Sequence, residues 1–415
     1  MRRTQVAIIG GGPGGLTLAQ GLRKHGIDVA VFEKSPVRAD YVQGFRLRLR
    51  QRGLDALSQN LPAHLLEAFY ATLGRAPTKS MLFDESLTPL GTEAWRDTGT
   101  READDTHPDK SVSRITLRQI LLSGLEDAVE IATYSHYDER DDGTVVAHFE
   151  NAAPVHADIL VGADGVASRV RKQLLPHASF ADTGVRRLAG KMTLARASEL
   201  GIVSELTDYN TGIRPRQGQS LMVTSHRVDP AAFATYGLIG QDDATHTGIP
   251  GFHFNNTTSY VWWNTAYPVD ALGSDDELAG KDGKALLDVL TERIAHWDPR
   301  ILDLIRFSDP STVALLKVRT SIPVEPWPTR RVTLLGDAIH AMTYFRALGG
   351  NTAIFDSGIL VRELVAATRN GEPLAAALHD YERAMLDHGN AAVHSSLVAM
   401  QRNVFGAESA LQPVQ

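Results

Sequence analysis

The feature that most constrains this chain is a run of glycines placed directly after a short apolar segment. Residues 6–9 read Val-Ala-Ile-Ile, and residues 10–15 read Gly-Gly-Gly-Pro-Gly-Gly. The apolar segment favours a buried strand, and residues 16–22 repeat apolar side chains at helical spacing. A second apolar segment at 29–32 completes a β-α-β pattern, which predicts a parallel sheet covered by helices.

The glycine spacing matches G-x-G-x-x-G at Gly10, Gly12 and Gly15. Gly10 permits a tight turn, Gly12 lets a pyrophosphate approach the backbone, and Gly15 lets the helix pack close to the strand. The start of the helix offers unpaired N–H groups to phosphates. Glu33 ends the second strand 18 residues after Gly15, where a carboxylate binds ribose hydroxyls. We therefore predict a dinucleotide site, which this unit alone does not assign to NAD or FAD. Its expected lining also includes Pro13, Gly14 and Lys34.

Composition excludes several classes of protein. The 415 residues are 43% hydrophobic and 22% charged, an ordinary globular mixture. The 42 basic and 49 acidic residues give a net charge of −7, which disfavours nucleic acid as a partner. The absence of cysteine excludes disulfides, Cys-ligated metals and a thiol nucleophile. Histidine spacing predicts no metal site, and no apolar run is long enough for a membrane span, so we expect a soluble, cytoplasmic protein.

Three further motifs follow along the chain. Residues 45–50 alternate apolar side chains with arginines, which predicts a strand whose arginines share one face. Those arginines either bind an anion or are merely solvated. Residues 157–162 form an apolar segment that leads into Asp164, and residues 332–335 form another that leads into Asp337. Taken alone, each aspartate is equally well explained as a helix cap.

Together with Arg114, which precedes a leucine-rich helix, these motifs resemble the FAD-dependent monooxygenases of the para-hydroxybenzoate hydroxylase type (class A flavoprotein monooxygenases). The resemblance covers nearly the whole chain and implies FAD as cofactor. It implies that Asp337 binds a ribitol or ribose hydroxyl and that Arg114 reaches the phosphates or a ribose. Asp164, with Arg169 as a second candidate, would lie near the pyrophosphate.

The same resemblance assigns Arg46 a position beside the flavin. It also assigns the pyrimidine edge of the flavin to the backbone N–H groups of Gly349, Gly350 and Asn351. The implied activity uses NADPH or NADH as a transient reductant, and O2, to hydroxylate or epoxidise an aromatic or polycyclic small molecule through a flavin C4a-hydroperoxide. No side chain is assigned as catalytic.

The flavin loop departs from the family pattern at Tyr344, where proline is usual, and at Ala347, where glycine is usual. Alanine reaches positive φ only at a cost. This departure leaves an alternative open, a redox-neutral cyclase or isomerase of a natural-product pathway that keeps FAD as a scaffold. A flavin-binding protein without turnover is a third hypothesis.

Aromatic strand segments suggest a substrate pocket suited to a planar ligand, although ordinary sheet packing also explains them. The candidate substrate residues are Met222, His253, Trp262 and Tyr344. We expect an α/β fold, with a Rossmann-like FAD-binding domain at 1–75, 110–181 and 319–370. A mixed-sheet substrate domain would comprise 76–109 and 182–318, followed by a C-terminal helical segment at 371–415. The protein would be a monomer or homodimer.

Overall fold

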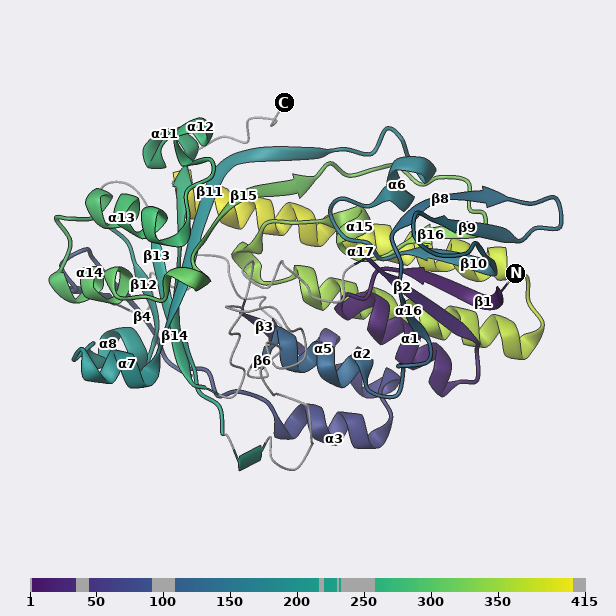
Figure 1. The fold of residues 1–415 in the computed structure, drawn as a ribbon, viewed down its shortest axis with the longest axis horizontal. Helices are drawn as coiled ribbons and strands as arrows, with labels where there is room; N and C mark the ends of the chain where they lie inside the picture. Colours follow the sequence, from purple (N-terminus) through teal and green to yellow (C-terminus); the bar gives the residue numbers. More distant parts are fainter. Residues whose placement is uncertain are drawn as a thin grey trace.

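The structure is a computed structural model that describes residues 2–34, 45–91, 109–215, 220–229, 231–232 and 258–405. It contains two seven-stranded sheets, each covered by helices, and a small two-stranded sheet between them (Figure 1). This mixed architecture confirms the predicted α/β fold class. We call the two halves the first lobe and the second lobe, after the order in which their sheets begin along the chain.

The sheet of the first lobe contains the predicted β-α-β unit. Its strands run in the order β7 (Val129–Ile131), β2 (Val29–Glu33), β1 (Arg2–Ile9), β10 (Val155–Gly162), β9 (Val145–Phe149) and β8 (Tyr134–Glu139), with β16 (Val332–Leu334) also paired to β10. The pairs among β7, β2, β1, β10 and β16 are parallel. The β8–β9 hairpin joins this sheet antiparallel at one edge, around the turn predicted at 141–143.

Helices bury both faces of the central strands, which explains why those strands are apolar on both sides. The helices of this lobe are α1 (Pro13–Lys24), α2 (Gln51–Asn60), α3 (Ala63–Ala71), α5 (Arg114–Leu122), α6 (Arg169–Leu174), α15 (Asp337–His340), α16 (Gly349–Asn370) and α17 (Leu374–Phe405). Helix α16 packs against α1, α2 and α17. It begins at Gly349, whereas the apolar periodicity places its start near Thr352.

The sheet of the second lobe runs β15 (Ala314–Ser321), β11 (Phe180–Thr193), β14 (Tyr260–Pro268), β13 (Leu221–His226), β12 (Asn210–Ile213), β4 (Ser80–Phe83) and β5 (Pro89–Gly91). Only β12 and β4 pair in parallel. The sequence predicts one helix here, at 283–296, but the structure has several. They are α7 (Leu194–Glu199), α8 (Ser204–Thr207), α11 (Val269–Leu272), α12 (Asp275–Leu278), α13 (Gly283–Arg293), α14 (Pro299–Arg306) and the 3-10 helix η2 (Pro310–Thr312).

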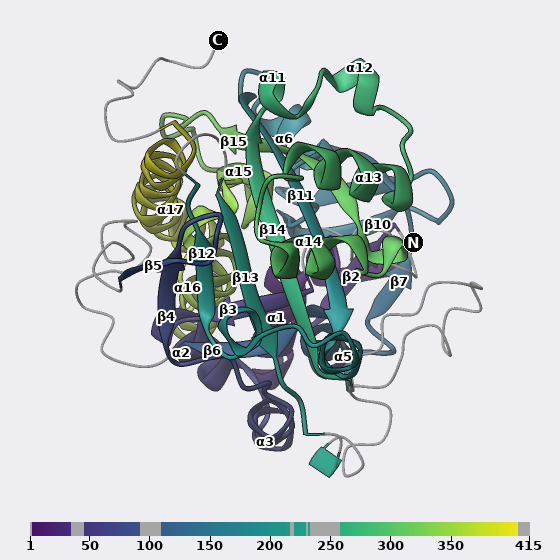
Figure 2. The same ribbon diagram turned by 90° about the vertical axis from the view of Figure 1, so that its left-hand side faces the viewer.

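The two faces of the second sheet have different neighbours. Helices α13 and α14 lie over its outer face (Figure 2), where Trp263, Leu188 and Val223 belong to a buried apolar core. The opposite face is turned toward the first lobe, and the two-stranded sheet of β3 (Arg46–Leu49) and β6 (Lys110–Ser113) lies beside it (Figure 1). Residues that alternate along β14 therefore face either the core of the second lobe or the first lobe.

A helix that crosses a bilayer must be both long and predominantly apolar, and the helices of the described residues do not meet this requirement.

Candidate functional site

The turn between β1 and α1 is so tight that only glycine fits it. Gly10 has φ +114°, and a Cβ built on it would lie 2.2 Å from the carbonyl oxygen of Ala163. A Cβ on Gly15 would lie 2.2 Å from the carbonyl oxygen of Gly10. Gly12 is the N-cap of α1, and no side chain caps the first N–H groups of the helix. The turn therefore presents bare backbone donors, as a pyrophosphate site requires.

Glu33 lies beside this turn at the end of β2. Its Oε2 accepts a 2.7 Å hydrogen bond from the backbone N–H of Gly11, and the residue is only 7% exposed. Lys34 follows as an exposed residue. The carboxylate thus fixes the turn and places a negative charge at its edge, a combination that suits a ribose with free hydroxyls.

Asp337 and the start of α16 form the opposite end of the candidate cofactor groove. Gly336 ends the strand segment with φ +64°, and Asp337 begins α15 as an exposed residue. A Cβ built on Gly349 would lie 3.6 Å from Oδ1 of Asp337, and one on Gly350 would lie 3.1 Å from a methyl group of Leu47. Because these two residues have no side chains, the backbone at the start of α16 is unshielded beside the carboxylate of Asp337.

The flavin loop keeps a left-handed residue even though glycine is missing. Tyr344–Arg346 form the 3-10 helix η3, and Ala347 follows with φ +53° and ψ +34°. The side chain of Asn351 holds this conformation, because its Nδ2 donates to the carbonyl oxygens of Ala347 (2.9 Å) and Arg48 (2.7 Å). Its Oδ1 accepts from the N–H of Arg50 at 2.8 Å. Alanine thus adopts the left-handed geometry that favours glycine.

Asp164 has both a structural bond and an unused oxygen. Its Oδ2 accepts a 2.7 Å hydrogen bond from the N–H of Arg169 at the start of α6, so the cap interpretation holds. Its Oδ1 is buried without a partner in the described structure, and burial raises the pKa of the carboxyl group. The Arg169 side chain instead contacts Glu150 and the carbonyl oxygen of Tyr134. These contacts occupy Nη1 of the guanidinium, and a role for Arg169 at the pyrophosphate stays a prediction.

The arginine-bearing strand connects the two lobes rather than facing solvent. Arg46 donates a 2.9 Å hydrogen bond to Oγ of Ser111, and its guanidinium carbon lies 5.6 Å from the ring centroid of Trp262. Burial lowers the pKa of Arg46 to about 10. Arg48 pairs with Asp109 instead. Arg114 begins α5 as a half-buried residue, and its backbone N–H donates to Phe45 at 3.3 Å.

The second sheet presents an unusual set of polar side chains toward the first lobe. We call the following residues the inner face: Arg187 and Lys191 of β11, Met222, Thr224 and His226 of β13, and Tyr260, Trp262 and Asn264 of β14. Strand pairing places Met222 opposite Asn264, Thr224 opposite Trp262, and His226 opposite Tyr260. Two predicted substrate residues, Met222 and Trp262, therefore share this face. His253 lies outside the described residues.

Several polar atoms of the inner face are buried without a partner in the described structure. They are Nε2 of His226, Oη of Tyr260, Nε1 of Trp262 and Nδ2 of Asn264, together with Oη of Tyr344 from the flavin loop. The guanidinium carbon of Arg187 lies 4.3 Å from the ring centroid of Tyr344, so that loop and the inner face meet. Unpaired buried polar groups are costly, so these atoms require a partner outside the protein, either water or a bound ligand.

Sequence reasoning missed His226, Tyr260 and Asn264. The signal was present for β14, because period-2 alternation places residues 260, 262 and 264 on one face. Nothing in the sequence identifies His226, whose Nδ1 lies 2.9 Å from Oγ of Ser111. Burial, aided by the charges of Arg46 and Lys191, lowers the pKa of His226 to about 3, so the imidazole is neutral.

A buried carboxylate also supports the Asp337 turn, and the sequence did not reveal it. Oδ2 of Asp356 accepts from the N–H of Gly336 at 2.9 Å and lies 2.7 Å from Nε2 of His340. Its Oδ1 lies 2.6 Å from Nε2 of His388. These contacts join α15, α16 and α17 directly behind the strand end that carries Asp337.

Comparison with known proteins agrees with this geometry. The FAD binding domain family matches residues 3–227 and 307–396. The dual O-methyltransferase/FAD-dependent monooxygenase elcB of Phaeosphaeria nodorum is 29% identical over 392 residues, which cover 88% of this chain and 41% of that protein. The FAD-dependent monooxygenase thnD of Trichoderma harzianum is 26% identical over 400 residues, covering 94% of this chain and 91% of that protein.

A solved structure from Photorhabdus luminescens, described as an FAD-containing monooxygenase, superposes with a TM-score of 0.82 at 28% identity. The superposition covers 98% of this chain and 100% of the Photorhabdus luminescens chain. The chain spans less than half the length of the first curated relatives, 41% and 46%.

The chain belongs to the FAD binding domain family, as its motifs predict, and its cofactor is FAD. The relatives and the solved structure named above are FAD-dependent or FAD-containing monooxygenases. The residues fit this cofactor. The glycine turn leaves backbone donors bare, Glu33 faces the turn, and Oδ1 of Asp164 is an unsatisfied buried acceptor.

Proposed function

We propose that the protein uses NADPH or NADH and O2 to hydroxylate or epoxidise an aromatic or polycyclic small molecule. For hydroxylation, one oxygen atom enters a C–H bond of the substrate and the other leaves as water, while NAD(P)H is oxidised to NAD(P)+ with uptake of one proton. The observation that carries this proposal is the set of buried, unpartnered polar atoms on the inner face and at Tyr344, opposite the start of α16.

FAD would be held along the carboxyl ends of the parallel strands. We propose that the adenosine half lies near Glu33 and Lys34, and that the phosphates meet the glycine turn of 10–15 with Asp164 and Arg114. The flavin half would meet Asp337, Arg46 and the helix start at 349–351. Bound flavin supplies the capacity to accept a hydride and to activate oxygen, which side chains lack. The protein binds, orients and shields it.

The inner face favours a planar ligand rich in oxygen acceptors. Nε1 of Trp262 and Nδ2 of Asn264 are hydrogen-bond donors, and Arg187 and Lys191 add positive charge. A neutral His226 adds no further charge. Carbonyl or phenolate oxygens would satisfy the donors, while Trp262 and Tyr260 pack against the rings.

The structure supports oxygen transfer over the redox-neutral alternative. That alternative rests on Tyr344 and Ala347 in the flavin loop, yet Ala347 takes the left-handed conformation that a glycine would take. The backbone of the loop therefore remains available to a flavin. We also propose the domain division given above, with residues 1–75, 110–181 and 319–370 serving the cofactor.

The decisive experiment measures oxygen transfer directly. The purified FAD-loaded protein is incubated with a panel of hydroxylated aromatic and polycyclic compounds, NAD(P)H and 18O2. We expect a substrate that stimulates NAD(P)H oxidation and a product heavier by one labelled oxygen atom. Steady conversion of a panel compound under anaerobic conditions without reductant would contradict the proposal and support the cyclase or isomerase.

A further inference from the structure

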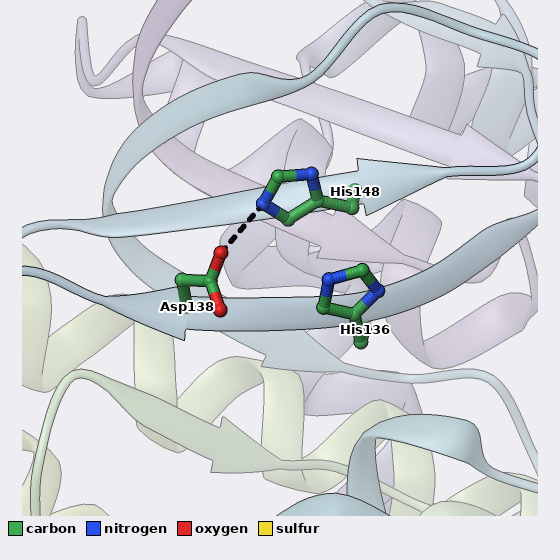
Figure 3. A group of neighbouring side chains, drawn as sticks. All are labelled: His136, Asp138 and His148. Carbon is green, nitrogen blue, oxygen red and sulfur yellow. Dashed lines mark hydrogen bonds and ion pairs between the residues drawn. The ribbon is translucent and has the colours of Figure 1, made fainter.

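Histidine spacing along the sequence predicts no metal site, but the pairing of β8 with β9 brings three potential metal ligands together. His136 and Asp138 lie on β8, and His148 lies on β9 (Figure 3). Strand pairing places His136 directly opposite His148. Asp138 is two residues from His136 and therefore shares its face, whereas Tyr137 between them is buried on the other side.

The ligand atoms already lie close to one another. One ligand atom from each side chain falls within 4.8 Å of the other two, and Nε2 of His148 lies 2.9 Å from Oδ2 of Asp138. In a tetrahedral site with bonds of about 2.0–2.1 Å, neighbouring ligand atoms are ~3.3 Å apart. The contact between His148 and Asp138 thus needs to open by only a few tenths of an ångström.

The two imidazole rings are neighbours across the hairpin, and one ring has to turn before both can bind the same ion. Their centroids are 4.5 Å apart and their planes differ by 4°, so they stack across the hairpin. Nδ1 of His136 lies 3.1 Å from Oγ of Ser135, which leaves Nε2 for a metal. The lone pair of an imidazole nitrogen lies in the plane of its ring, so two parallel rings do not point at one ion. His136 is exposed, which allows its ring to turn toward His148 and Asp138.

We propose that His136, His148 and Asp138 bind one divalent transition-metal ion, of the class of Zn2+, Cu2+ or Ni2+, on the outer surface of the first lobe. Two imidazoles and one carboxylate suit these ions, whereas Mg2+ and Ca2+ prefer oxygen ligands alone. Strand β8 is the last strand of its sheet, so the remaining coordination positions are open to water. The ion would exchange with solvent and would link the two strands of the hairpin.

The test uses the tag-free, FAD-loaded full chain after treatment with a chelator and desalting. Titration with ZnCl2, followed by calorimetry, should show one saturable equivalent. The variants His136→Ala and His148→Ala should each lower the affinity for zinc about tenfold or more. His296→Ala, an exposed histidine of the second lobe, is the matched control and should leave binding unchanged.

A second readout reports the ligands themselves. With one equivalent of Cu2+, electron paramagnetic resonance should show coupling to two imidazole nitrogens in the unaltered protein and to one in His136→Ala. Zinc should also raise the melting temperature of the unaltered protein, because a ligand that binds only the folded state stabilises it. It should not raise that of the double variant, which carries both His136→Ala and His148→Ala. No saturable binding, or binding that survives in the double variant, would overturn the proposal.

Discussion

Ala347 is one of two non-glycine residues with positive φ in the described structure, the other being Leu87. A side chain in this conformation destabilises the folded protein by about 1–2 kcal/mol. Glycine at the same position raises the conformational entropy of the unfolded chain, which lowers stability by about 0.4–1 kcal/mol. We expect Ala347→Gly to raise the free energy of unfolding by about 0.5 kcal/mol, since the relief of strain exceeds the entropic penalty. Denaturant unfolding of the FAD-loaded protein measures this change.

Ala376→Gly is the control, because Ala376 is exposed and helical in α17. Glycine there should destabilise the protein by about 0.5–1 kcal/mol. If both variants change stability in the same direction, the strain assigned to Ala347 is absent.

Single residues could be predicted from the sequence where their constraint is local. The roles of Gly10 and Gly15 follow from a motif of six residues, and the structure shows the close contacts that exclude a side chain. The bonds of Asn351 could not be foreseen, because its partner Arg50 lies far away in the chain. Such long-range hydrogen bonds depend on how whole elements pack, which residue type alone does not reveal.

At the level of elements, Asp356 is the point at which α15, α16 and α17 meet. Burial alone would raise the pKa of Asp356, but His340 and His388 lower it to about 2. Burial lowers the pKa of His340, but the opposing charge of Asp356 outweighs this and raises it overall. The carboxylate contribution to stability is present above about pH 4 and is lost as pH falls toward 2. The imidazolium contribution is present below about pH 6.5 and is lost as pH rises through the elevated pKa.

We therefore expect Asp356→Asn to cost the most stability, about 3–5 kcal/mol, between pH 4 and 6.5. The penalty should shrink as the pH rises through the elevated pKa of His340, because the imidazole then loses its charge. Unfolding by denaturant at pH 5.5 and at pH 9 measures this difference. Asp387→Asn, on the exposed side of α17, should change stability little at either pH. A penalty independent of pH would show that the cluster is not charged.

The sequence predicts elements well where periodicity is strong and poorly where packing decides. The β-α-β unit and the β8–β9 hairpin follow from local patterns. The start of α16 was placed too late, because Gly349 and Gly350 suggest a loop, whereas Leu47 packs against Gly350 and admits the helix. The short helices of the second lobe carry too few turns for a periodic signal.

At the scale of the whole molecule, the space between the lobes should bind the substrate. Trp262→Phe keeps an aromatic ring but removes Nε1–H, which has no protein partner in the described structure. We expect KM to rise about tenfold, since a lost hydrogen bond costs about 1.4 kcal/mol, while the melting temperature stays the same. Steady-state kinetics with the substrate found by the labelling experiment measures this change.

Trp263→Phe is the matched control from the same strand. Its Nε1 donates a 2.8 Å hydrogen bond to Ser308 on the outer face. Losing this bond should lower the melting temperature and leave KM unchanged. The reverse pattern, or equal effects in both variants, would mean that the inner face does not bind substrate.

The architecture of the molecule was more accessible from sequence than its substrate site. Separated motifs identify the fold and the cofactor, because each lies at the carboxyl end of a parallel strand. The side chains that line the space between the lobes depend on strand register. Arg46 and Trp262, for instance, lie in different sheets and are brought together only by the packing of the lobes.

The pairing of β16 with β10 has a consequence for biosynthesis. Leu160 and Val332 are neighbours in the first sheet, yet five of the seven strands of the second sheet, β11–β15, are encoded between them. When the ribosome has made β10, its partner strand β16 is still untranslated. The residues of β10 that pair with β16 therefore lack this partner until β16 has been synthesised. During this period chaperones would protect the nascent chain from aggregation.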